Sequence, residues 1–320
     1  MIPTPTPLMS VPNVSDGRDI PTLDAVERAF TDAGARLLDR HADTDHHRAV
    51  FTLAGQPGHL APALLDGARA AVDRIDLGQP RGLHPHVGAI DVVPLVYIDP
   101  SMHDAATAEA LVTAELLATQ LDLPVFLYGE MAVVGRTRAE IRRGGLAELT
   151  RRIADGRLKP DFGPHTVHPT AGAVLVGARP LLVAFNLELA PPTTFDEARK
   201  IAGLIREGGP NGLPGVRAIA IQLGSRDDLI QISCNVEDTH AVPLATLIHA
   251  VLEYASISAG ELVGLAPHHA FDGFPWELAM PGFDPARHIL ENALSAPASS
   301  PPAYAPDGPT PPPAGRPSTI

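Results

Sequence analysis

The chain has 320 residues, and its 24 Lys and Arg against 37 Asp and Glu give a formal net charge of −13 with histidine neutral. This acidic balance argues against a general nucleic-acid-binding protein, whose affinity comes from a basic face that neutralises phosphates. With 45% hydrophobic residues the chain can bury a real core, and at about 150 residues per domain its length allows two domains.

Neither a membrane span nor a secretory leader is expected. No apolar stretch approaches the roughly 20 residues that a span needs, and the first residues lack a basic region followed by an apolar one. The single cysteine, Cys234, cannot form an intramolecular disulfide, which fits a reducing compartment and predicts a cytoplasmic protein. The 14 histidines are unusual, because neutral imidazole serves both as a metal ligand and as a proton carrier.

Hydrophobic periodicity predicts a βαββαβ order in the first half of the chain. The expected strands are residues 8–14, 35–39, 49–53 and 88–98. The expected helices are one capped by Thr22, with Leu23, Val26 and Phe30 on one face, and one over residues 58–75. An added helix over residues 104–121, a strand over 124–128 and a basic helical stretch over 137–153 follow.

The same order appears again after residue 180. The expected strands are residues 181–189, 216–223, 228–236 and 261–266, and the expected helices are residues 195–207 and 244–255. We therefore predict an α/β (α+β) fold of two ferredoxin-like βαββαβ subdomains, over residues 1–178 and 179–290, with a ligand cleft between them. Residues 291–320 are rich in proline and poor in apolar residues, so we expect a disordered tail.

Three loops carry candidate chemistry. In the first, His84 and His86 lie between Gly82 and Gly88, before an apolar strand. Pro85 restricts His84 to extended backbone, and a histidine held at the mouth of a strand is suited to proton transfer. The alternative is an ordinary turn whose imidazoles bond to nearby carbonyl groups.

The second loop contains His41, Asp43, Asp45 and His46. It resembles the H-x-H-x-D-H loop of metallo-β-lactamase-type hydrolases, with Asp43 in place of the second histidine. A metal-dependent hydrolase that uses these four residues is therefore one alternative. A polar turn is the other, and the βαββαβ order does not suit that hydrolase fold.

The third loop runs over residues 161–172, where two glycines and two prolines make a rigid segment with close backbone access. It either grips a heterocycle or carboxylate or simply links the two units. Arginines gather in the helical stretch before it, where guanidinium groups suit carboxylate recognition but also suit a solvated helix face. These arginines are Arg136, Arg138, Arg142, Arg143, Arg151 and Arg152.

Several strings together resemble the glutamate formiminotransferase family in its bacterial single-function form. They include VPNVSDG at residues 11–17, RAVFTLAGQP from Arg48, HPHVGAIDVVP from His84, PDFGP at residues 160–164, LVAFNLEL at 182–189 and QISCNVED at 231–238. The similarity runs in register over about the first 270 residues. It implies two α/β subdomains and, from the family's habit, a homodimer.

The resemblance implies transfer of a formimino group from formiminoglutamate to tetrahydrofolate, a co-substrate, with no metal, membrane or nucleic-acid partner. The family's catalytic histidine corresponds to His84. One imidazole suits this reaction, because the attacking nitrogen loses a proton and the leaving nitrogen gains one. A further folate contact corresponds to Gly215. The family's folate loop corresponds to Gly163, Pro164, His165, Thr166, Val167, His168, Pro169, Thr170, Ala171 and Gly172.

The chain departs from the family's pattern at three positions. His86 stands where members commonly have arginine, His41 where animal members have an acidic residue, and Ala171 where animal enzymes carry an aromatic that can stack on the pterin. The group that orients His84 is then open among Asp39, Asp43 and Asp45, and the expected substrate or orienting contacts are His41, Asp39, Arg48 and His86. A folate-binding protein of the same fold without transferase activity is the remaining alternative.

Overall fold

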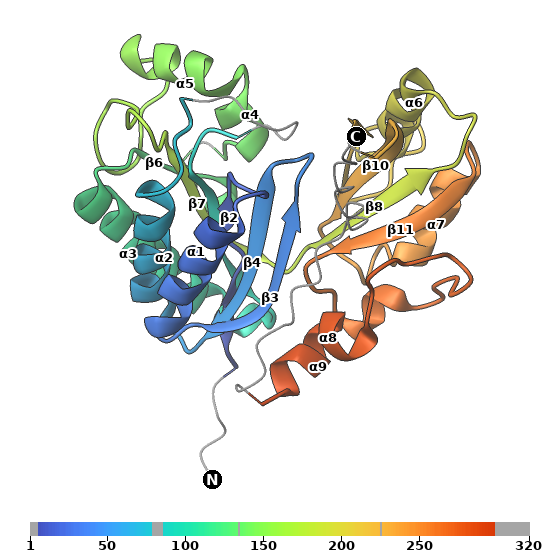
Figure 1. Ribbon diagram of the computed structural model, residues 1–320, viewed down its shortest axis with the longest axis horizontal. Helices are drawn as coiled ribbons and strands as arrows, with labels where there is room; N and C mark the ends of the chain where they lie inside the picture. Colours follow the sequence, from blue (N-terminus) through green and yellow to red (C-terminus); the bar gives the residue numbers. More distant parts are fainter. Residues whose placement is uncertain (1–5, 79–85, 134, 225, 298–320) are drawn as a thin grey trace, which may run out of the picture.

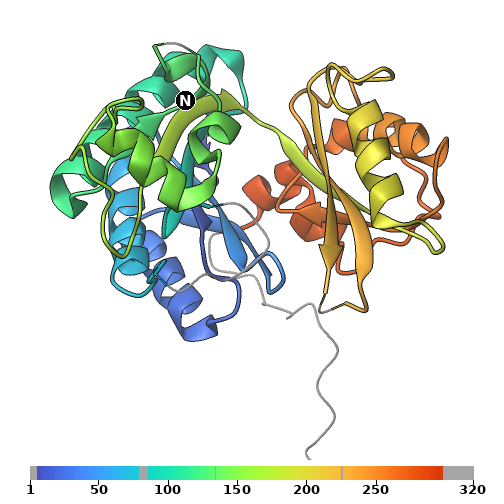
Figure 2. The same ribbon diagram turned by 90° about the horizontal axis from the view of Figure 1, so that it is seen from above.

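The computed structural model describes residues 6–78, 86–133, 135–224 and 226–297, which form two β-sheets with their helices (Figure 1). The seven-stranded sheet occupies one half of the molecule and the four-stranded sheet the other. Seen from above, an extended segment after β7 crosses from the first half to β8 in the second (Figure 2). In the part of the chain described here, no helix is long and apolar enough to cross a membrane.

The first sheet contains the predicted βαββαβ unit and extends beyond it. β1 and β2 are two consecutive parts of one interrupted strand inside the sheet. This strand pairs with β4 on one side and with β5 on the other, and β3 pairs with β4. β7 then adds in parallel to β5, and β6 adds in parallel to β7. The strands are β1 Leu8–Ser10, β2 Asn13–Val14, β3 Arg36–Asp43, β4 Arg48–Gly55, β5 Ile90–Tyr97, β6 Val125–Leu127 and β7 Val174–Pro180.

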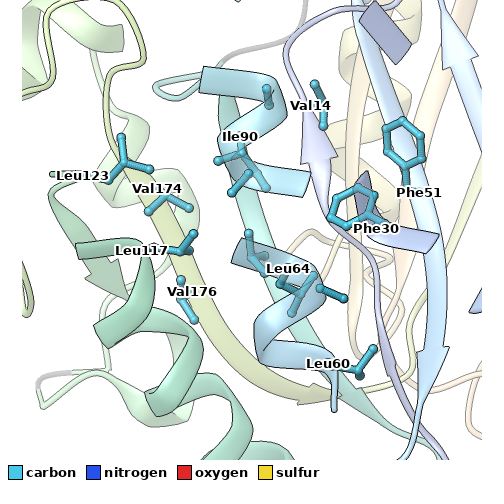
Figure 3. Packing of buried hydrophobic residues seen from close by; sticks show 14 of the residues in the cluster. Val14, Phe30, Phe51, Leu60, Leu64, Ile90, Leu117, Leu123, Val174 and Val176 are labelled. Atoms are coloured by element: carbon cyan, nitrogen blue, oxygen red, sulfur yellow. The ribbon is translucent and has the colours of Figure 1, made fainter. Parts of the chain in front are cut away.

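Three helices cover one face of the first sheet: α1 Ile20–Asp32, α2 Leu60–Val72 and α3 His103–Leu121. Their inner side chains, among them Phe30, Leu64 and Leu117, are fully buried against Ile90 and Val174 of the sheet (Figure 3). Side chains alternate between the two faces of a strand, so this packing leaves the other face of each strand free for different contacts.

That other face is divided between two helical segments and the second sheet. α4 Arg138–Arg142 and α5 Gly145–Ala154 pack on β5, β6 and β7 through an apolar cluster that includes Ile141 and Leu149. α9 Leu290–Ser295, which follows the short α8 Pro285–His288, packs through Leu290 on Met9 of β1. Between these two covered areas, the first sheet faces the second.

The second sheet has the ferredoxin-like order β11-β8-β10-β9 with every neighbour antiparallel. The apolar residues of its strands pack against α6 Phe195–Ile205 and α7 Leu244–Leu252. The alternate residues of β8 and β10, such as Asn186 and Ser233, are polar and point away from these helices toward the first sheet. The strands are β8 Val183–Leu189, β9 Val216–Leu223, β10 Leu229–Val236 and β11 Ile257–Val263.

These sheets confirm the predicted fold class of two βαββαβ units, with corrections at several boundaries. α1 begins earlier than predicted, because Asp19 and not Thr22 is its N-cap, and the Asp19 carboxylate accepts the Thr22 amide. The basic helical stretch is two helices, because Gly144 and Gly145 both adopt positive φ, which ends a helix. The division of the chain into two subdomains at residue 178 stays a prediction.

The predicted disordered tail begins too early in the sequence. Residues 291–295 lie in α9, and the Arg36 guanidinium donates to the carbonyl oxygens of Ala293 (2.5 Å), Leu294 (2.9 Å) and Ala296 (2.6 Å) at the end of this helix. These carbonyls have no partner within the helix, so a cation there is stabilising. The remainder of the predicted tail, residues 298–320, lies outside the described residues.

The α1–α2 contact gives a test of this packing. A Cβ added at Gly67 of α2 would lie 2.1 Å from Cε1 of Phe30, so Gly67→Ala should destabilise the fold by about 1–3 kcal/mol through overpacking. Gly203 of α6 is the matched control, because a Cβ there meets nothing within 4 Å, and Gly203→Ala should stabilise by about 0.5–1 kcal/mol. Urea unfolding midpoints compare the two variants. Equal stabilisation by both would contradict the close helix contact.

Candidate active site

A cleft of about 680 Å³ lies between the two sheets. Its volume is within the range of ligand pockets. The first sheet contributes side chains from β1 to β5 and from β7, the α4–α5 corner contributes arginines, and the second sheet contributes its polar face. The polar and charged lining residues are Asn13, His41, Asp43, His46, Arg48, Thr52, Arg138, Arg142, Arg143, Arg179, Asn186, Arg217, Ser233 and Asn235.

The cleft is strongly cationic although the protein is acidic. Six arginines line it against one carboxylate, that of Asp43, among the residues that the structure describes. Guanidinium groups present planar, bidentate donors that match carboxylates. The lining therefore favours an anionic ligand with more than one carboxylate.

Two of these arginines, Arg48 and Arg179, are partly buried, and the Nε atom of each is inaccessible to solvent. Burial lowers the pKa of Arg48 to about 9, with Arg142 lowering it further and Asp91 partly opposing the shift. Burial also lowers the pKa of Arg179 to about 10, against a smaller opposing effect of Tyr128. A buried charge is costly unless it is compensated, so an anion that enters the cleft beside these groups relieves a cost already present in the fold.

The α4–α5 corner places the other arginines. Thr137 and Glu140 form a capping box that starts α4, and the Arg152 guanidinium donates to the carbonyl oxygens of Glu140 (2.9 Å), Ile141 and Arg143 (3.3 Å) at its end. These bonds hold a helix of only five residues in one position. The predicted arginine cluster is thus divided: Arg138, Arg142 and Arg143 line the cleft, while Arg152 stabilises the corner that carries them.

Arg136 and Arg151 also lie outside the cleft lining. Arg136 pairs with Asp161, whose Oδ2 accepts the Leu127 amide at 2.7 Å, so this arginine fixes the loop after β6. Arg151 pairs with Glu148 on the exposed face of α5, as the alternative of a solvated helix face predicts.

His84 lies outside the described residues. Hydrogen bonds to Asp91 and Ser15 fix the backbone of the segment that follows it. Asp91 of β5 accepts the amides of Val87 (2.7 Å) and Gly88 (3.2 Å) with Oδ1. The Ser15 hydroxyl donates to the Gly88 carbonyl at 2.7 Å. His86 lies beside Asp91 and Arg48, in a small gap next to the cleft.

The predicted folate loop, residues 163–172, meets this same segment. Gly88 and Gly172 form an antiparallel bridge, in which the Ala173 amide donates to Val87 and the Ala89 amide donates to Ala171. Gly172 has φ +74°, and a Cβ on it would lie 2.1 Å from the Val87 carbonyl oxygen, so only glycine fits this close approach. The loop is therefore beside the predicted catalytic segment but does not contribute to the described lining of the cleft.

Two other features of the loop bear on its predicted role. The His168 Nδ1 accepts the Ala171 amide at 3.0 Å, so this imidazole shapes the turn. Ala171 is 2% exposed and packs in the core of the first unit. Its side chain points into the core, away from any ligand on the loop surface. Gly215, the other predicted folate contact, lies two residues before Arg217 of the cleft, with φ +67°.

His41 and Asp39 project from β3 toward the second unit. The His41 Nε2 lies 3.9 Å from Oε1 of Glu261 on β11, and His41 lines the cleft. Asp39 is buried, does not line the cleft, and has its pKa raised by burial, against opposing effects of His41, His288 and Arg287. Of the four expected orienting or substrate contacts, His41 and Arg48 line the cleft. His86 lies in the adjoining gap, and Asp39 does not line the cleft.

The predicted polar loop of the metal hypothesis is a short hairpin turn. β3 continues to Asp43, and the Asp43 Oδ1 accepts the His46 amide at 2.6 Å, which closes the turn. The His47 Nδ1 accepts the Gly17 amide at 3.1 Å and joins this hairpin to the loop after β2. Within the described residues, no three His, Cys, Asp or Glu side chains converge as a metal site.

Sequence reasoning missed Asp91 and the polar face of the second sheet. Asp91 is one acidic residue in an otherwise apolar strand, a pattern that could have singled it out, because a buried carboxylate needs partners. The polar alternation of Asn186 on β8 and of Ser233 and Asn235 on β10 is also visible in the sequence. Its meaning depends on the first sheet that lies opposite, which the sequence does not show.

Comparison with known proteins agrees with these observations. The family model described as "Formiminotransferase domain, N-terminal subdomain" matches residues 8–179. Glutamate formimidoyltransferase of Streptococcus pyogenes serotype M1 is 32% identical over 293 residues, which cover 89% of this chain and 97% of that protein. The glutamate formimidoyltransferase of Thermoplasma acidophilum is 32% identical over 295 residues, covering 89% of this chain and 96% of the relative.

Bifunctional relatives match as well. Formimidoyltransferase-cyclodeaminase of Sus scrofa is 34% identical over 270 residues, which cover 80% of this chain and 49% of the relative. The chain thus spans about half of that protein, whereas it spans nearly the whole length of the two glutamate formimidoyltransferases. The resemblance drawn from the sequence is confirmed, and the chain belongs to the formiminotransferase family.

Proposed function

We propose that this protein is a glutamate formimidoyltransferase. It transfers the formimino group from N-formimino-L-glutamate to tetrahydrofolate and releases L-glutamate and formiminotetrahydrofolate, a step of histidine breakdown and one-carbon metabolism. The observation that carries the proposal is the similarity, over nearly their whole length, to relatives named for this activity. The arginine-lined cleft supports it, because both substrates bear carboxylates.

The buried guanidinium groups suit the carboxylates of formiminoglutamate. Arg142 and Arg179 line the cleft, and the Nε atom of each is buried and has no hydrogen-bond partner within the described part of the chain. A carboxylate that pairs with such a group satisfies a buried donor and compensates a buried charge together. We assign these two arginines to the donor substrate, with Arg48 beside them supplying additional positive potential.

The reaction needs a group that moves one proton. A nitrogen of the reduced pteridine forms a bond to the amidine carbon as the bond from that carbon to the glutamate nitrogen breaks. The proton leaves the pteridine nitrogen and arrives on the glutamate nitrogen. We assign this transfer to His84 as general acid and base, because an imidazole near neutral pH accepts and returns a proton, typically contributing about 10²–10⁴ in rate.

Tetrahydrofolate is assigned to the loop of residues 163–172, with Gly215 as a further contact. The support is that Ala171 of this loop accepts the Ala89 amide and that Ala173, just after the loop, donates to Val87, so a ligand on the loop is close to the segment that follows His84. We also propose a homodimer that works in the cytoplasm, for which the support is the family's habit and the single, buried Cys234.

Replacing His84 tests the proposed catalysis. His84→Ala should lower kcat for formimino transfer by at least about 100-fold, because it removes the proton carrier, while the Kd for tetrahydrofolate changes little. Steady-state kinetics with both substrates and a binding titration measure the two quantities. His249→Ala, on the exposed surface of α7, is the control and should leave both unchanged. If His84→Ala turned over nearly as fast as the unmodified protein, the assignment of His84 would be contradicted. If the unmodified protein bound folate tightly but transferred no formimino group, the non-catalytic alternative would be selected.

Replacing Arg179 tests the donor subsite. Arg179→Met should weaken binding of formiminoglutamate by roughly 10- to 100-fold, the value of a charge-assisted hydrogen bond. Its melting temperature should not fall, because methionine removes a buried cation that the fold itself leaves under-compensated. Calorimetric titration and thermal melting measure the two effects. Arg199→Met on the exposed face of α6 is the control and should change neither. Unchanged affinity in Arg179→Met would remove this residue from the site.

A further inference from the structure

Asp91 is the point at which the cleft and the segment after His84 are joined. Its side chain is 3% exposed, and its two carboxylate oxygens have different partners. Oδ1 accepts the Val87 amide at 2.7 Å and the Gly88 amide at 3.2 Å, whereas Oδ2 pairs with the Arg142 guanidinium. One buried group thus holds backbone on one side and a cleft-lining cation on the other.

The backbone that Asp91 holds also bonds to Ala171, near the end of the proposed folate loop, and to Ala173, just after the loop. The carbonyl of Val87 accepts the Ala173 amide at 2.8 Å, and the Ala89 amide donates to Ala171 at 2.8 Å. The amides of Val87 and Gly88 are directed to Asp91, so its carboxylate completes the bonding of this short segment. A displacement of Asp91 would move backbone that follows His84 in the sequence and is bonded to the proposed folate loop.

The cation that Asp91 holds lies at the end of a short helix. Arg142 is the last residue of α4, two residues before the turn at Gly144, and its Nε has no hydrogen-bond partner among the residues that the structure describes. A carboxylate fixed in one orientation restricts the guanidinium to one orientation, which lowers the entropy cost of binding an anion. Asp91 also reduces the repulsion between Arg142 and Arg48, since its carboxylate pairs with Arg142 and attracts Arg48.

We propose that Asp91 is a positioning residue that couples donor binding at Arg142 to the placement of the segment following His84. The proposal rests on the proposed function and deepens it. It assigns two separable tasks to the two oxygens: Oδ2 sets the affinity for the carboxylate-bearing donor, and Oδ1 sets the turnover rate by fixing the amides of Val87 and Gly88.

Two substitutions separate these tasks. In Asp91→Asn the amide oxygen can still accept from Val87 and Gly88, but the amide nitrogen faces Arg142 and the pairing is lost. KM for formiminoglutamate should then rise about as much as in Arg142→Gln, roughly 10-fold or more, with kcat within about threefold of the unmodified protein. Asp91→Ala should raise KM similarly and also lower kcat by at least about 10-fold, because the backbone segment is no longer held.

Hydrogen exchange supplies a readout that does not depend on activity. Amide exchange at Val87 and Gly88 should be faster in Asp91→Ala and unchanged in Asp91→Asn. Glu109 gives the matched control: it is a buried carboxylate that accepts the amides of Gly58 and Ala61, and it lies on α3, which covers the face of the first sheet opposite the cleft. Glu109→Gln should reduce stability without changing KM or kcat.

The outcomes are distinct. Unchanged KM in folded Asp91→Asn, equal kcat in the two Asp91 variants, or unchanged exchange at Val87 and Gly88 in Asp91→Ala would overturn the proposal. If Asp91→Ala does not fold, the comparison of Asp91→Asn with Arg142→Gln decides, because the proposal requires that both raise KM to a similar extent. Absence of formimino transfer in the unmodified protein would instead contradict the proposed function, and the exchange experiment would still test the Asp91 contacts.

Discussion

The buried positive charge between the two sheets is the constraint on which the rest of the site depends. Arg48 and Arg179 are partly buried, and their pKa values are lowered to about 9 and about 10 because their guanidinium groups are withdrawn from water. Most exposed arginines would contribute little to recognition in solvent, where a charge pair is worth at most about 1 kcal/mol. Groups removed from water interact more strongly with an incoming anion, so the fold bears a cost that a carboxylate-bearing ligand recovers.

This local charge explains how an acidic protein can bind anions. A net charge of −13 produces an overall field that opposes the approach of formiminoglutamate or a folate. Specific affinity then has to come from a few oriented donors inside the cleft, and less from long-range attraction. The two-sheet architecture supplies such a place, because α1, α2 and α3 cover one face of the first sheet and leave its cleft-facing side chains, such as Arg48 and Thr52, opposite the polar face of β8 and β10.

Much of the fold follows from local sequence patterns. Alternating apolar residues predict most strands of both βαββαβ units, and the apolar stripe of Leu244, Leu247 and Ile248 predicts α7. The sequence could not show that β7 joins β5 as a parallel neighbour, since that pairing depends on contacts between residues far apart in the chain. Nor could it show that residues 291–295 form a helix held by Arg36, because the composition of this segment is shared with the proline-rich residues that follow.

The site was partly predictable for the same reason. Residue types identified the arginines of the α4–α5 stretch as candidates, but only the three-dimensional arrangement separates Arg142, which lines the cleft, from Arg136, which pairs with Asp161. Likewise, Asp43 and His46 have the composition of a metal loop, yet their contacts are those of a hairpin turn. Asp91 acquires its importance from what surrounds it, two amides and a guanidinium that come from other segments.

The most direct test of the account follows the transferred carbon itself. Formiminoglutamate labelled with ¹³C at the formimino carbon is incubated with tetrahydrofolate and the purified protein, and the label is followed by NMR. The account predicts that the label leaves glutamate and appears on the reduced pteridine in proportion to the glutamate released. A label that stays on glutamate while both substrates bind to the protein would contradict it.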